Sequence, residues 1–154
     1  MIKNYLKTYF SRAFIAACIY CITVVIFLIN EKYQSVWILF LGNALYMLSI
    51  GTLVFIRNKA KKFNQSGVTS AISGHILSIT GAALSVILSV VLYLIFSASN
   101  GGESLHKAPA DMSVHPTFSM LFILVLVAAF GNTVAGFFAA LFTSFDVSKK
   151  KQNR

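Results

Sequence analysis

Residues 66–96 are the stretch that most constrains the fold of this chain, because they contain no Asp, Glu, Lys or Arg. Their unbroken apolar part, residues 76–96, would form a helix about 31 Å long at about 1.5 Å per residue. That length is sufficient to cross the hydrocarbon core of a bilayer. The sequence therefore predicts a membrane-spanning helix here.

Small and bulky side chains separate onto opposite faces of this predicted helix when they are placed at about 100° per residue. The small, weakly polar face consists of Ser70, Gly74, Ser78, Gly81, Ser85 and Ser89, and the bulky face of Ile76, Ile79, Val86, Ile87, Val90 and Leu94. Lipid tails attract apolar side chains as well as other helices do, so membrane helices associate where small residues allow their backbones to approach. We expect the small face to contact another helix.

The composition of the whole chain agrees with a membrane protein. Of its 154 residues, 57% are hydrophobic and only 11% are charged, whereas soluble domains usually have about 25% charged residues. The net charge of +9 comes from basic residues at the ends of apolar segments, and no separate basic domain exists. This distribution is typical of membrane orientation and does not favour nucleic-acid binding.

Three further apolar segments complete the predicted architecture, with Trp37 at the start of one of them as an interfacial anchor. The predicted spans are residues 13–29, 36–56, 68–96 and 117–145, joined by an outer loop at 97–116 and followed by a basic tail at 146–154. The outer loop contains both prolines of the chain, which favours turns over a further helix. We predict one integral membrane domain, an all-α up-down bundle of four transmembrane helices.

Residues 1–13 have an amphipathic pattern. Apolar residues form a stripe at helical spacing, made of Ile2, Tyr5, Leu6, Tyr9, Phe10 and Ala13, and Lys3, Lys7 and Arg12 lie off it. The segment is either a short amphipathic helix in the headgroup layer or a basic flank of the first span. The first span ends without a small-residue cleavage site, so we interpret it as a retained helix and not as a signal peptide.

The distribution of Lys and Arg predicts the orientation in the membrane. Three flanks hold most of them: the N-terminal segment, the loop with Arg57, Lys59, Lys61 and Lys62, and the tail with Lys149, Lys150, Lys151 and Arg154. The other two connections contain only Lys32 and Lys107. We therefore expect both termini in the cytoplasm, an inner (plasma) membrane location, and contact of the basic flanks with anionic lipid headgroups.

The fourth span has a second small face, whose opposite side is rich in phenylalanine. Together the two small faces define the predicted helix-packing seam: Ser70, Gly74, Ser78, Gly81, Ser85 and Ser89 with Ala128, Ala135, Gly136 and Ala139. The seam could close within one chain or between copies in a homo-oligomer. Small faces more often pack than line pores.

The spans contain four polar side chains of interest, Asn43, Tyr46, His75 and Asn132. Asn43 and Asn132 each follow a glycine and lie at the same depth, about 21 Å of helix from the first cytoplasmic charge. They could hydrogen-bond to each other as a polar clasp that Tyr46 extends. Alternatively, each could bond separately to a backbone group or hydroxyl of a neighbouring helix and stabilise ordinary helix packing. His75 could relay protons, but every acidic residue lies outside the spans, which favours a structural role.

Other candidate groups give little support for catalysis. Cys18 and Cys21 lie in an apolar helix, where we interpret them as small hydrophobic residues and not as a redox pair. The outer loop holds five potential metal ligands, but they lack the spacing of a closed zinc site. These residues are Glu103, His106, Asp111, Met112 and His115. We predict no cofactor and no metal.

The sequence favours a small polytopic membrane protein that acts as a non-catalytic accessory or interaction subunit, with a homo-oligomer or another membrane protein as its partner. The alternative is a small-solute or ion transporter or channel formed by oligomerisation, with Asn43, Tyr46, His75 and Asn132 along its path. A lipid-modifying or redox enzyme is a third, less favoured possibility.

Overall fold

A computed structural model describes residues 2–30, 33–60, 67–99 and 116–152, all of them in helices. Side chains are described within 9–29, 35–59, 68–98 and 120–145. The order is α1 (Ile2–Asn30), the short 3-10 helix η1 (Tyr33–Val36), α2 (Trp37–Ala60), α3 (Gly67–Ser99), α4 (Pro116–Leu126), the π-helical turn η3 (Val127–Gly131) and α5 (Asn132–Gln152).

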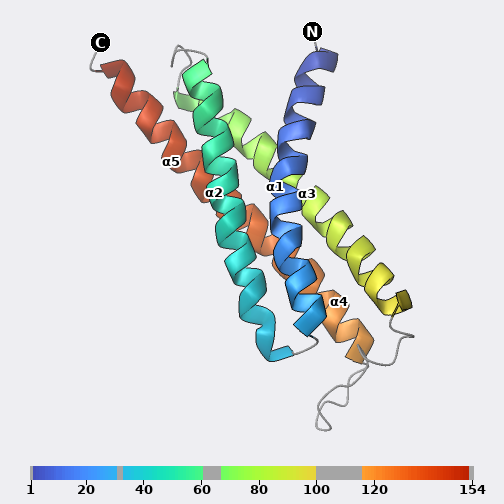
Figure 1. Ribbon diagram of the computed structural model, residues 1–154. Helices are drawn as coiled ribbons and strands as arrows, with labels where there is room; N and C mark the ends of the chain where they lie inside the picture. The colour runs from blue at the N-terminus through green and yellow to red at the C-terminus, as the bar shows by residue number, and fades with distance from the viewer. Residues whose placement is uncertain (1, 31–32, 61–66, 100–115, 153–154) are drawn as a thin grey trace.

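Within the described residues, four helices are long and apolar enough to cross a membrane. Their candidate spans are Tyr9–Ile29, Trp37–Lys59, Val68–Ala98 and Met120–Thr143. The prediction of an all-helical protein with four such segments is confirmed. The fourth candidate span is one rod of α4, η3 and α5 (Figure 1).

The start of the chain belongs to the first long helix. The sequence predicts residues 1–13 to be either a short amphipathic helix or a basic flank of the first span, and α1 runs without a break from Ile2 to Asn30. No charged or helix-breaking residue other than Arg12 interrupts the sequence near the junction, so one helix accommodates both parts. The side chains of residues 1–8 lie outside the described part.

The four long helices pack in the order α1, α2, α5, α3, so that each contacts two main neighbours. Helices α2 and α3, although consecutive in the sequence, touch much less than α2 and α5 or α3 and α5 do. Figure 1 shows both chain termini at one end of the molecule, together with the end of α2 and the start of α3. This order brings the second and fourth spans into direct contact.

Bulky apolar residues cover the outside of the molecule. On α3, Ile76, Ile79, Ile87 and Leu94 are each at least half exposed, and on α5 a row of phenylalanines faces outward. Trp37, at the start of α2, is 63% exposed, as expected of an interfacial anchor. An apolar exterior of this extent suits a lipid environment and would be unfavourable in water.

Candidate functional site

The two predicted small faces lie against each other in one chain. Gly136 of α5 is so close to Ser78 of α3 that an added Cβ would lie 2.6 Å from the serine Cβ. One turn further along, a Cβ on Gly74 would lie 2.7 Å from the Cβ of Ala140. Only glycine permits these backbone approaches.

The other residues of the predicted seam are also inside the bundle. Ser70, Ser78, Ser85, Ser89, Ala128 and Ala139 are at most 5% exposed, Gly81 is buried, and Ala135 is half-buried. The Ser85 hydroxyl donates to the carbonyl of Gly81 at 2.9 Å, and Ser89 donates to Ser85 at 2.7 Å. Both acceptors are backbone carbonyls of α3. These two hydrogen bonds therefore lie within one helix and do not link α3 to another helix.

Tyr46 joins three helices at the centre of the bundle. From α2, its fully buried hydroxyl donates to the carbonyl oxygen of Ser78 on α3 at 2.6 Å. Its ring lies against Gly81, and a Cβ on Gly136 would lie 3.4 Å from it. The phenol therefore fills the space that the two glycines leave, and it does not extend a clasp between the asparagines.

Asn43 and Asn132 lie at the interface of α2 and α5, but their amides do not bond to each other. The Asn43 amide contacts Gly131, the residue before Asn132. Asn132 is 0% exposed, and neither its Nδ2 nor its Oδ1 has a hydrogen-bond partner among the described residues; the same holds for the Oδ1 of Asn43. The direct polar clasp that the sequence allowed is therefore not formed between the two amides.

His75 lies at the edge of the α3–α5 interface. Its ring stacks on Phe137 with the ring centroids 4.9 Å apart and an angle of 23° between the planes. The imidazole therefore packs on the phenylalanine-rich side of α5, separate from Tyr46 and the asparagines at the centre.

The sequence interpretation missed a polar group at the end that holds both chain termini. Arg57 and Asn58, treated as flanking residues, are only 8% and 2% exposed. The Arg57 guanidinium lies 5.0 Å from the centre of the Tyr9 ring, and the Asn58 Nδ2 donates to Ser70 Oγ at 2.8 Å. The amphipathic stripe containing Tyr9 was the only sequence signal for this contact.

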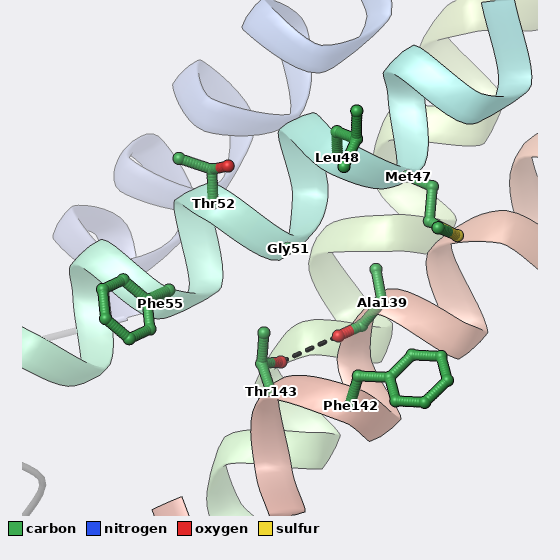
Figure 2. A pocket seen from close by; sticks show the side chains of 8 residues that line it. All are labelled: Met47, Leu48, Gly51, Thr52, Phe55, Ala139, Phe142 and Thr143. Atoms are coloured by element: carbon green, nitrogen blue, oxygen red, sulfur yellow. Dashed lines mark hydrogen bonds between the residues drawn. The ribbon is translucent and has the colours of Figure 1, made fainter. Parts of the chain in front are cut away.

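Two shallow grooves run along the outer surface of α2. The larger, of about 340 Å³, lies between α2 and α5 and has Gly51 and Ala139 at its floor with Phe55 and Phe142 at its sides (Figure 2). The smaller, of about 290 Å³, lies between α1 and α2 and includes Ser49. Both are lined mostly by apolar side chains, so neither resembles a catalytic cleft with convergent polar groups.

The remaining candidates contribute no shared centre. Cys18 is exposed and Cys21 buried, and both are free thiols. The possible metal ligands of the outer loop, residues 103–115, lie outside the described residues. No family model, curated protein or solved structure matches the chain.

Proposed function

We propose that this chain is a small multi-pass membrane protein that acts as a non-catalytic accessory or interaction subunit. Four apolar helices and an apolar exterior support membrane insertion. The positions of Lys and Arg support an up-down bundle in an inner membrane with both termini in the cytoplasm and the basic flanks at anionic headgroups.

The observation that carries the proposal is the apolar groove of about 340 Å³ on the outer surface between α2 and α5. The predicted small faces cannot be the partner surface, because they contact each other inside one chain, at Gly136 with Ser78 and at Gly74 with Ala140. These residues are used in building the bundle and are not open to a partner. A partner must therefore bind outside it. The α2–α5 groove is the outer surface best suited to a helix, because its lining includes the small residues Gly51, Thr52 and Thr143, which permit close backbone approach.

We propose that one transmembrane helix of a partner protein occupies this groove. In Gly51→Leu the added Cβ would lie at an ordinary 3.9 Å from the Ala139 Cβ, and the rest of the side chain would fill the open groove, so the fold itself should tolerate the change. Ser49→Leu, in the neighbouring groove, is the matched control. Purification in a gentle detergent should yield a stable complex with wild type and Ser49→Leu but not with Gly51→Leu.

Two results would contradict this function. Purification of the wild type as a monomer in gentle detergent would show that it has no stable partner. A complex that still forms with Gly51→Leu would show that the partner does not bind in the α2–α5 groove. If the co-purifying protein is a second copy of the chain, the interaction is a homo-oligomer, which the sequence also allowed.

A transporter or channel is the second candidate, and the unpartnered amide of Asn132 is the observation in its favour. A conduit needs a hydrated path past Asn43 and Asn132. Reconstitution into liposomes tests it: flux of water or small solutes that Asn132→Leu abolishes would support the conduit, and liposomes no more permeable than protein-free ones would exclude it.

Orientation has its own test. Fusions of a fluorescent protein that matures only in the cytoplasm should be bright at both the N- and the C-terminus. A dark fusion at either end would contradict the proposed topology.

A further inference from the structure

Apart from the Asn58 Oδ1 near the end of α2, whose Nδ2 bonds to Ser70, each of the four long helices contributes one buried side chain with a polar atom that lacks a hydrogen-bond partner among the described residues. They are the Tyr20 hydroxyl on α1, the Asn43 Oδ1 on α2, the Ser78 Oγ on α3, and both polar atoms of Asn132 on α5. All four residues are at most 8% exposed. In an apolar surrounding an unsatisfied amide or hydroxyl costs on the order of several kcal/mol, so this set requires an explanation.

These side chains occupy neighbouring levels of the bundle. A Cβ on Gly42 would lie 3.1 Å from the Tyr20 ring, which places that ring beside the residue next to Asn43. The Asn43 amide in turn contacts Gly131, next to Asn132. Three of the four residues therefore lie at one level.

Ser78 lies about one turn away from that level. It contacts Gly136, and Gly136 follows Asn132 by one turn of α5. On α2, Tyr46 follows Asn43 by about one turn and binds the Ser78 backbone. The four side chains thus form a polar layer that extends over roughly one helical turn, and we call them the central polar layer.

An irregular backbone turn borders the same layer. The π-helical turn Val127–Gly131 ends directly before Asn132, and Gly131 within it contacts Asn43. Single π-helical turns inside α-helices frequently occur at functional sites. In a membrane, irregular helix segments are tolerated where side chains or ordered water satisfy the freed backbone groups.

We propose that the central polar layer is a binding site for internal water, which bridges the Asn43 and Asn132 amides. The ligand must both donate and accept, because Asn132 offers Nδ2 as a donor and Oδ1 as an acceptor. It must be neutral, because no Asp, Glu, Lys or Arg lies in the spans near the layer. It must also be small, because Asn132 is completely enclosed. Water meets all three conditions, and buried waters typically make about three hydrogen bonds to such groups.

Water-edited solid-state NMR on the full chain in lipid bilayers, with ¹⁵N-labelled asparagine, tests the site on the folded wild type. Asn132→Leu identifies the Asn132 side-chain signal by its loss. We expect magnetisation to pass from water to the Asn132 Nδ2 protons in wild type, and the transfer to fall at least twofold in Asn43→Leu. Gly51→Ala, further along the same helix interface, is the matched control and should leave the transfer unchanged.

The proposal is overturned if wild-type Asn132 receives no magnetisation from water, in particular if the two amides instead show a direct contact that marks a dry clasp. It is also overturned if the transfer is unchanged in Asn43→Leu, since water would then reach Asn132 without a shared site. The proposed accessory function does not depend on either result, because its partner groove lies on the outer surface.

Discussion

Helix α5 has two interfaces that are built in different ways. Toward α3 it presents Gly136 and Ala140 against Ser78 and Gly74. Further along α3 the hydroxyls of Ser85 and Ser89 bond within their own helix, whereas the Ser78 Oγ has no partner among the described residues. Toward α2 it presents the Asn132 amide beside Asn43 without a partner for either Oδ1 among the described residues. The contact with α3 is thus made mainly by close backbone approach, whereas the contact with α2 also buries two amides whose oxygens lack partners among the described residues.

Two features could hold these helices together: close backbone approach and hydrogen bonding of polar side chains. If close approach dominates between α3 and α5, adding one methyl group there should lower the free energy of unfolding, and removing a hydroxyl should not. The following substitutions test this in order of decreasing effect.

Gly136→Ala should have the largest effect. Its new Cβ would lie 2.6 Å from the Ser78 Cβ, so the helices must separate, at a cost of about 1 to 3 kcal/mol. Gly51→Ala is the matched control on the outer side of α2: its Cβ meets Ala139 at an ordinary 3.9 Å, and its stability should be unchanged or raised by up to about 1 kcal/mol. Equilibrium unfolding in detergent measures both. Equal free energies of unfolding for the two variants would show that the stability of the bundle does not depend on the close backbone approach at Gly136.

Tyr46→Phe should have an intermediate effect. It removes the hydroxyl that donates to the Ser78 carbonyl at 2.6 Å and keeps the ring that fills the space beside Gly81. We expect a loss of about 1 kcal/mol in the free energy of unfolding. A loss above about 3 kcal/mol would mean that the hydroxyl holds the centre of the bundle and that packing alone does not.

Ser85→Ala should have the smallest effect, within about 0.5 kcal/mol of wild type. The serine hydroxyl bonds only to the Gly81 carbonyl of its own helix among the described residues, and such bonds contribute little to helix stability. The same unfolding measurement applies. A destabilisation of 1 kcal/mol or more would indicate a hydrogen bond between helices and would break the distinction between the two interfaces.

Much of this architecture was accessible from the sequence because the membrane imposes strong rules on length and composition. The apolar length of residues 76–96 was sufficient to predict a span, and helical spacing was sufficient to predict the small faces of α3 and α5. Whether those faces meet within one chain or between chains does not follow from spacing, since both arrangements bury the same residues.

The order in which the helices pack around the bundle could not be predicted from the sequence for a related reason. Short connections show which helices are consecutive but not which lie diagonally, and α2 contacts α5 far more than it contacts α3. The burial of Arg57 was missed because a basic residue at the end of a span usually faces the headgroups, whereas here its guanidinium lies over the Tyr9 ring.

The contact between α2 and α5 is the central claim, because it places Asn43 beside Asn132 and forms the outer groove. Disulfide formation between Gly51→Cys and Ala139→Cys, in a Cys18→Ala, Cys21→Ala background in native membranes, tests it most directly. The Cβ positions lie 3.9 Å apart, within the range that a disulfide spans. Oxidation should give a cross-linked monomer that neither single-cysteine variant forms, and cross-linking only between chains, or none at all, would contradict the arrangement.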